Sequence, residues 1–234
     1  MESRVIIALD FKSKEETINF LDKFQNEKLY VKVGMEAIYG QGFELIKEIK
    51  ERGHQIFLDL KCHDIPNTVK GAMRQLARLG VDMVNVHASG GIAMMKAAID
   101  GLEEGKVTDQ RPLCIAVTCL TSLDQGILDK ELLIEKSLEA VVLHWAKNAK
   151  EASLDGVVCS PLESKMIHEN LGEDFLTVTP GIRLLEDNLD DQKRVTTPTI
   201  AKELTSSYIV VGRTITKAKN PLERYLKVVE EFQG

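Results

Sequence analysis

The sequence has no stretch of the kind that separates domains or forms disordered tails. Linkers are commonly rich in proline, glycine or serine, yet no such run, low-complexity tract or shift in composition occurs. The hydrophobic share of 44% and the charged share of 28% are ordinary for a globular protein. A single domain over residues 1–234 is therefore the simplest organisation.

Long apolar runs and dense basic runs are also missing. A membrane-spanning helix needs about 20 consecutive apolar residues, and no segment approaches that length. The opening MESRVIIALDF is too short an apolar run, and too soon followed by charge, for a signal peptide. With a net charge of -6 and no basic run, we expect a cytoplasmic protein without a membrane or nucleic-acid partner. An anionic small molecule can still bind locally.

Cysteine and histidine occur without the spacings of metal sites. The four cysteines stand on or beside apolar runs and form no CxxC pair, and the five histidines form no HxH or HxxxH pair. Buried free thiols are favoured over a disulfide or a zinc site, and we expect no metal. The cysteines are Cys62, Cys114, Cys119 and Cys159.

What the sequence does contain is a regular alternation of short β-rich runs and longer amphipathic runs. The predicted strands are residues 5–10, 30–35, 55–61, 83–88, 113–118, 155–160, 175–180 and 208–213. Eight strand and helix pairs match a single-domain (β/α)₈ TIM barrel, an α/β fold that typically needs about 250 residues. A doubly wound open sheet is the alternative, but no GxGxxG motif follows the first strand, where a dinucleotide fold carries it.

Helix signals lie between the predicted strands. Ser13 can cap a helix, and Glu16 stands at capping-box spacing from it. Two further helices are predicted to end at Gly53 and Gly80, because a glycine just past the last turn is a common stop signal. A long helical stretch, residues 131–152, precedes the sixth strand.

Charged residues gather where the predicted strands end, which is where barrel enzymes hold their active sites. Because strand side chains alternate, Phe57, Asp59 and Lys61 share one face, and His63 joins them if the strand continues. An isolated buried ion costs several kcal/mol, so such charges must be paired or used. The residues at these ends are Asp10, Lys32, Asp59, Lys61, Gly212 and Arg213.

The charges of the second and third strands form an array of alternating sign, Lys32, Asp59, Lys61 and Asp64. Each residue by itself is best interpreted as part of an ion-pair network that closes the barrel top. As a group they favour a catalytic interpretation. An array of this kind holds an ammonium group in place, which suits a proton donor to a carbanion.

A long polar segment, residues 179–199, follows the seventh strand and is typical of a lid or binding loop. It contains Arg183 and Gln192, and the eighth strand is followed by Gly212 and Arg213. Barrel enzymes often bind phosphate at this place, through guanidinium groups and backbone N–H groups at a helix start. We therefore predict a phosphate site there, although Arg183 alone is equally consistent with a surface charge.

The segment DLKCHDIPN resembles the Asp-x-Lys-x-x-Asp signature of the orotidine 5'-phosphate decarboxylase family. The resemblance continues through VIIALD, VKVGME, VNVHASGG, VTPGIR and IVVGRTIT, in order along the whole chain. Sugar-phosphate enzymes of the same superfamily share the signature alone, and the DIPNT, PGIR and VVGR segments narrow the match to the decarboxylases.

The resemblance implies a cofactor-free carbon-carbon lyase that converts orotidine 5'-monophosphate to uridine 5'-monophosphate (UMP) and carbon dioxide, the last step of de novo UMP synthesis. It places Lys32, Asp59, Lys61 and Asp64 beside the reacting C6 carbon, with Lys61 as the proton donor to the carbanion. Asp59 then lies near the departing carboxylate, where it either destabilises the bound substrate or positions Lys61.

The resemblance also implies binding roles and a homodimer. Thr121 would contact the pyrimidine edge, although the residues alone favour Thr118 equally. Asp64 and Thr68 would enter the site of the neighbouring subunit. Asp10 and Lys32 would bind ribose hydroxyls, and Arg183, Gln192, Gly212 and Arg213 would bind the phosphate.

Two other functions remain open at this stage. A magnesium-dependent sugar-phosphate decarboxylase or aldolase needs an extra carboxylate near the end of the second strand, where this chain has Lys32 with Glu36 nearby. A non-catalytic nucleotide-binding barrel would have a broken array, and here the array is complete. His63 and His87 are interpreted as structural, because the decarboxylation needs one proton donor and Lys61 fills that role.

Overall fold

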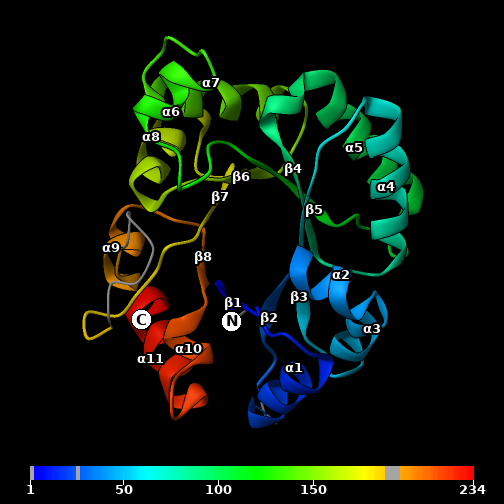
Figure 1. Ribbon diagram of the computed structural model, residues 1–234, viewed down its shortest axis with the longest axis vertical. Helices are drawn as coiled ribbons and strands as arrows, with labels where there is room; N and C mark the ends of the chain where they lie inside the picture. The colour runs from blue at the N-terminus through cyan, green and yellow to red at the C-terminus, as the bar shows by residue number, and fades with distance from the viewer. Residues whose placement is uncertain (1–2, 25–26, 188–195) are drawn as a thin grey trace.

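The computed structural model describes residues 3–24, 27–187 and 196–234. Eight parallel strands pair in chain order and close into a barrel (Figure 1). The predicted (β/α)₈ barrel is confirmed, and the open sheet is wrong because β1 also pairs with β8. The strands are β1 (Val5–Ala8), β2 (Tyr30–Gly34), β3 (Gln55–Cys62), β4 (Met83–His87), β5 (Leu113–Val117), β6 (Gly156–Val158), β7 (Leu176–Thr179) and β8 (Tyr208–Val211).

The helices form a ring outside the strands (Figure 1). Among the described residues no helix is both long and apolar enough to cross a membrane. The helices are α1 (Lys14–Leu21), α2 (Met35–Gln41), α3 (Glu44–Glu51), α4 (Pro66–Arg78), α5 (Gly91–Gly105), α6 (Gln125–Lys130), α7 (Leu138–Glu151), α8 (Pro161–Leu171), α9 (Pro198–Glu203), α10 (Arg213–Thr216) and α11 (Pro221–Gln233), with the 3₁₀ turns η1 (Asp22–Phe24) and η2 (Ala88–Gly90).

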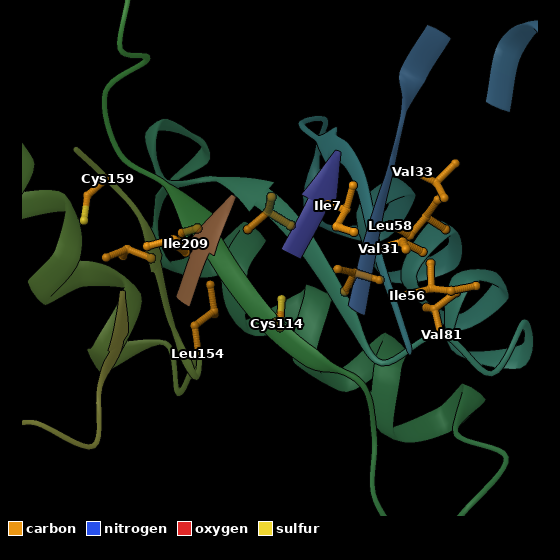
Figure 2. Close-up of a cluster of buried hydrophobic side chains, with 14 of the residues drawn as sticks. Ile7, Val31, Val33, Ile56, Leu58, Val81, Cys114, Leu154, Cys159 and Ile209 are labelled. Atoms are coloured by element: carbon orange, nitrogen blue, oxygen red, sulfur yellow. The ribbon is translucent and has the colours of Figure 1, made fainter. Parts of the chain in front are cut away.

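Alternation along the strands builds two separate hydrophobic cores. The outer core packs strand residues against the helices, and Figure 2 shows Ile7, Val31, Ile56 and Leu58 within it. The inner core fills the barrel with the opposite set of side chains. Its buried members are Ile6, Ala8, Tyr30, Phe57, Met83, Ile115, Val178 and Val210. This apolar plug lies below the polar residues at the C-terminal strand ends.

The predicted helix signals are largely confirmed. The Ser13 hydroxyl accepts a hydrogen bond from Glu16 N at the start of α1. The Glu16 carboxylate, however, accepts from Lys12 N rather than from Ser13 N, so the predicted capping box is displaced by one residue. Gly53 and Gly80 follow α3 and α4 with φ of 80° and 68°, a conformation that a Cβ atom disfavours.

The predicted helix over residues 131–152 is wrong in its first third. The helix α7 begins only at Leu138, because Ser137 caps it by accepting a hydrogen bond from Ala140 N. The Gln125 side chain accepts from Leu138 N and donates to the Lys136 carbonyl, which fixes the preceding loop. Leu133 lies in this loop with a left-handed φ of 55°, which a helix excludes.

Candidate active site

A cavity of about 300 Å³ opens at the C-terminal ends of the strands. Its volume is at the lower end of the range of small-molecule sites. The charged residues predicted for the second, third and eighth strands reach it, together with apolar side chains from the top of the inner core. The apolar walls include Ala8, Phe57, Val117, Val158 and Val210.

Asp59 lies at the centre of the charged residues. Lys61 Nζ donates to Asp59 Oδ1 at 2.6 Å, and Lys32 Nζ lies 3.2 Å from the other carboxylate oxygen, Asp59 Oδ2. Lys32 Nζ also lies 3.6 Å from Asp10 Oδ1, whose side chain is 64% exposed at the rim. The structure therefore brings Asp10, Lys32, Asp59 and Lys61 together, as the sequence predicted.

Asp59 is buried, with 7% of its surface exposed, yet it is held as a carboxylate. Burial by itself raises the pKa of a carboxyl group. The charges of Lys32 and Lys61, with hydrogen bonds from Lys61 and Asn85, outweigh burial and lower the pKa of Asp59 below its ordinary value. At neutral pH Asp59 is therefore a carboxylate that lies between the side-chain nitrogens of Lys32 and Lys61.

A bulge in β3 places Lys61 beside Asp59. Leu58 pairs with Val84 and Cys62 pairs with Val86, so three residues of β3 oppose the single residue Asn85 of β4. Lys61 has a left-handed φ of 52°, a conformation that costs roughly 1–2 kcal/mol for a residue with a Cβ atom. Such strain persists where the surroundings enforce it, often at functional sites.

Asn85 belongs to this site but was not predicted from the sequence. It is 1% exposed, and its side chain accepts a hydrogen bond from Lys61 N at 2.8 Å and donates one to Asp59 Oδ1 at 2.7 Å. The available signal was a polar residue in the middle of the apolar run MVNVH.

The basic residues lie on the side of the cavity formed by β7 and β8. Arg183, Gly212 and Arg213 all line it. Arg183 is 8% exposed and donates to the Ile182 carbonyl, which makes it a buried residue rather than a surface charge. The predicted Gln192 lies outside the described residues.

The described ends of the 179–199 segment are joined to each other. Ile182 and Thr196 form an isolated parallel bridge, with Arg183 N donating to the Thr196 carbonyl and Thr196 N to the Gly181 carbonyl. Asp187 accepts hydrogen bonds from Leu184 N and from the Thr214 hydroxyl of α10. This end of the segment is therefore tied to the helix that Arg213 begins.

Asp64 and Thr68 are not among the residues that line the cavity. Both are exposed, and the Asp64 carboxylate accepts from Ile65 N at 2.6 Å. His63 is also exposed and outside the cavity lining, so the predicted extension of the Phe57 face to His63 is wrong: the bulge ends the alternation. Its ring lies 5.6 Å from that of His87.

Thr121 lines the cavity, whereas Thr118 is buried and donates to the Val158 carbonyl. The geometry therefore separates two threonines that the sequence left equal. None of the four cysteines is in a disulfide, as predicted. Cys119 and Cys159 also line the cavity, a position that was not predicted from the sequence.

Within the described ranges, no three His, Cys, Asp or Glu side chains gather in a way that can hold a metal ion. Glu36, the carboxylate that kept the magnesium alternative open, is exposed on α2 and is not among the residues lining the cavity. Lys32 and Lys61 occupy the two oxygens of Asp59, the positions that a cation would need.

Known proteins match the chain over nearly all its length. Residues 3–228 match the family described as "Orotidine 5'-phosphate decarboxylase / HUMPS family". Orotidine 5'-phosphate decarboxylase of Bacillus cereus (strain B4264) is 60% identical over 235 aligned residues, which cover 100% of this chain and 99% of the relative.

Two solved structures extend the match to three dimensions. The crystal structure of orotidine 5'-phosphate decarboxylase from Lactobacillus acidophilus has 44% sequence identity and a TM-score of 0.88, covering 98% of this chain and 99% of the other. An uncharacterised conserved protein from Geobacillus kaustophilus has 49% identity and a TM-score of 0.89, covering 97% and 99% of the two chains. With a family match over residues 3–228 and a relative that is 60% identical over 99% of its length, this chain belongs to the orotidine 5'-phosphate decarboxylase family.

Proposed function

We propose that this protein decarboxylates orotidine 5'-monophosphate to UMP and carbon dioxide, the last step of de novo pyrimidine nucleotide synthesis. One observation carries the proposal: a single cavity holds the interlocked Lys61, Asp59 and Lys32 on one side and Arg213 on the other. The first group suits carbanion chemistry and the second suits a phosphate anion. Membership of the family supplies the substrate.

Lys61 is the proposed proton donor. Loss of carbon dioxide breaks the bond between C6 and the carboxylate and leaves the electron pair on C6, where the pyrimidine ring delocalises it poorly. An ammonium group fixed beside C6 stabilises that charge and then transfers a proton to the carbon. The 2.6 Å contact with Asp59 Oδ1 supports this role because it holds Lys61 Nζ at the cavity.

Asp59 is proposed to act next to the departing carboxylate. Its carboxylate is already ionised and paired before substrate binds. A second carboxylate brought close to it is repelled, and that repulsion is relieved when carbon dioxide leaves. The same contacts position Lys61, so both effects can come from one residue.

The remaining assignments concern binding. Asp10 and Lys32 are proposed to bind ribose hydroxyls and Thr121 the pyrimidine edge, and all three line the cavity. Guanidinium groups pair well with phosphate oxygens, which supports the assignment of the phosphate to Arg213 and Arg183. Gly212 and Gln192 complete the proposed phosphate site.

We further propose a cytoplasmic homodimer in which Asp64 and Thr68 enter the partner's site. Both residues are exposed and absent from the lining of this chain's own cavity, and Ile65 between them is 67% exposed, so this segment is accessible to a second subunit. The charged array of each site is then completed by Asp64 of the other subunit.

Carbon dioxide release from orotidine 5'-monophosphate tests the function directly. We expect release without added metal and in excess EDTA, and UMP as the product. Activity that disappears in EDTA and returns with magnesium would favour the sugar-phosphate alternative. UMP binding without any release would indicate a non-catalytic nucleotide-binding barrel.

A further inference from the structure

The buried side chain of Asn85 connects the two parts of the array that do chemistry. It comes from β4, not from the charged segment itself, and it is 1% exposed. Its Oδ1 accepts from Lys61 N at 2.8 Å, and its Nδ2 donates to Asp59 Oδ1 at 2.7 Å. A single amide therefore binds the backbone of one array residue and the carboxylate of the other.

The amide of Asn85 makes both contacts in only one of its two orientations. With the amide reversed, an N–H group would face the N–H of Lys61 and an oxygen would face the Asp59 carboxylate. An ionised carboxylate at position 85 accepts but cannot donate, and a hydroxyl is too short to bridge both groups. The chemistry of the position thus requires one donor and one acceptor, side by side.

The contact to Lys61 N compensates for the bulge in β3. Between the Leu58 and Val84 pair and the Cys62 and Val86 pair, the register shifts. The Asn85 side-chain oxygen binds the Lys61 N–H at this irregular point, while Lys61 holds its left-handed φ of 52°. Buried N–H groups need an acceptor, so the amide supports the backbone that presents the Lys61 side chain.

The contact to Asp59 fixes the rotation of its carboxylate. Oδ1 accepts from both Asn85 and Lys61, which leaves Oδ2 toward Lys32 at 3.2 Å. The three donors, from Asn85, Lys61 and Lys32, together fix the orientation of the Asp59 carboxylate. Rotation of the carboxylate would break the contacts to both lysines together.

We propose that Asn85 is a positioning residue for the decarboxylation: its amide sets the Asp59 carboxylate and the Lys61 backbone so that Lys61 Nζ is aimed at the carbon that receives the proton. This inference rests on the proposed function. It assigns Asn85 no contact with the reacting atoms. Its effect passes through Lys61 and Asp59, and a 1 Å misplacement of such groups can cost about 100-fold in rate.

The experiment replaces Asn85 and separates positioning from folding. We expect Asn85→Ala to lower kcat by about 100-fold, with UMP affinity within about threefold of the wild type, because the proposed phosphate and ribose contacts stay intact. Thr177→Val is the matched control. It removes another buried side chain that binds backbone, the Ser207 N–H, on the outer face of β7 away from the cavity. Its kcat should be unchanged.

Asn85→Asp supplies a signature that a purely structural role does not give. Burial and the adjacent Asp59 carboxylate raise the pKa of a carboxyl group introduced at position 85. Where it is ionised, at higher pH, it repels Asp59, but when protonated it has one donor and one acceptor and restores both contacts. The ratio of its kcat to that of the wild type should rise at least several-fold as pH falls. The charged and titratable groups facing this position are Asp59 and Lys61 on β3, Lys32 beyond Asp59 on β2, and His87 farther along β4.

The outcomes are distinguishable. If the wild type releases no carbon dioxide, the proposed function fails first. If the wild type is active and folded Asn85→Ala keeps kcat within about threefold, or if the Asn85→Asp ratio does not rise as pH falls from the alkaline range, the positioning role is wrong. Should Asn85→Ala fail to fold, kcat and UMP affinity are measured instead for Asn85→Ser, which keeps a hydrogen-bonding group at this position.

Discussion

The two sides of the cavity carry charge in different ways. On the side of β2 to β4, opposite charges already neutralise one another: Asp59 contacts both Lys61 and Lys32. On the side of β7 and β8, the cavity is lined by two guanidinium groups, Arg183 and Arg213. The nearby carboxylate of Asp187 binds Thr214, Leu184 N and Arg224, and so serves the framework.

The difference fits the roles proposed for the two sides. Groups that act in the transition state work best when they are preorganised, because nothing then has to be rearranged during the reaction. Guanidinium groups suit a site that binds an anion, and binding energy from such a remote part of a substrate can be used at the reacting centre. Substitutions on the two sides should therefore change different kinetic constants.

Lys61→Ala should have the largest effect. It removes the proposed proton donor and the charge that stabilises the carbanion, so we expect kcat to fall by at least about 10⁴-fold. UMP affinity should stay within about tenfold, because UMP lacks the carboxylate and makes its other contacts elsewhere. Steady-state carbon dioxide release and UMP titration measure the two quantities.

Lys50→Ala is the matched control for Lys61→Ala. Lys50 also pairs with a partly buried carboxylate, that of Asp82, at 2.9 Å, but this ion pair lies at the N-terminal end of the barrel. Its loss should reduce stability and leave kcat unchanged. Appreciable turnover by Lys61→Ala would show that the proton comes from another group.

A mixture of two inactive variants tests the shared site. In a hybrid of Lys61→Ala and Asp64→Asn subunits, one of the two sites receives both native residues. Random exchange between symmetric dimers should then restore about one quarter of the wild-type rate. Each variant alone supplies the baseline. With subunit exchange verified by a tagged subunit, a mixture that stays inactive would contradict the contribution of Asp64 across the interface.

Arg213→Ala should change binding more than chemistry. A hydrogen bond to a charged group contributes about 1.5–3 kcal/mol, so we expect KM for orotidine 5'-monophosphate to rise about 10- to 100-fold. Turnover of orotidine, which has no phosphate, should not change. Arg111→Ala removes another paired guanidinium, at 2.6 Å from Asp155 on the opposite end of the barrel, and should leave KM unchanged. Equal losses on both substrates would contradict a phosphate role for Arg213.

The comparison of the two sides also shows what sequence could predict. The barrel was predicted from eight β-rich runs that alternate with amphipathic runs. The hydrophobic period of each run can be recognised from neighbouring residues alone, and the runs can then be counted. The closeness of Asp10, Lys32, Asp59 and Lys61 followed from one rule, that parallel strands end on one side. Neither result required a contact between residues distant in the sequence.

The bulge and Asn85 could not be predicted in the same way. Lys61 has its left-handed φ at the point where the register between β3 and β4 shifts. The register depends on how the two strands pair, which the sequence of one strand does not show. Alternation alone extended the charged face to His63, which the structure places outside the cavity lining. A buried asparagine becomes meaningful only when its two partners are known.

The smallest expected effect is that of His87, a histidine near Lys61 and Asp59, on the pH dependence of stability. Burial, with the nearby charges of His63 and Lys61, lowers the pKa of His87 below its ordinary value. Burial and the charge of Arg52 lower the pKa of His54 in the same direction. Because the unfolded chain then binds more protons than the folded one, stability falls as pH drops below about 6.5.

Replacement of His87 should therefore flatten this dependence. In His87→Gln the fall in Tm between pH 7 and pH 5 should be smaller by about 2 °C or less, since the ring is only partly buried and solvent weakens its interactions. The contribution of Asp59 to stability is also lost as pH falls, but at more acidic pH, because its pKa is lowered from the ordinary carboxyl value. Thermal unfolding monitored by circular dichroism measures both windows, with His144→Gln on the exposed face of α7 as the control. If the dependence of Tm on pH is the same in His87→Gln as in the wild type, His54 or another group is responsible for the loss of stability between pH 7 and pH 5. The charge of Lys61 then has no measurable effect on the titration of His87.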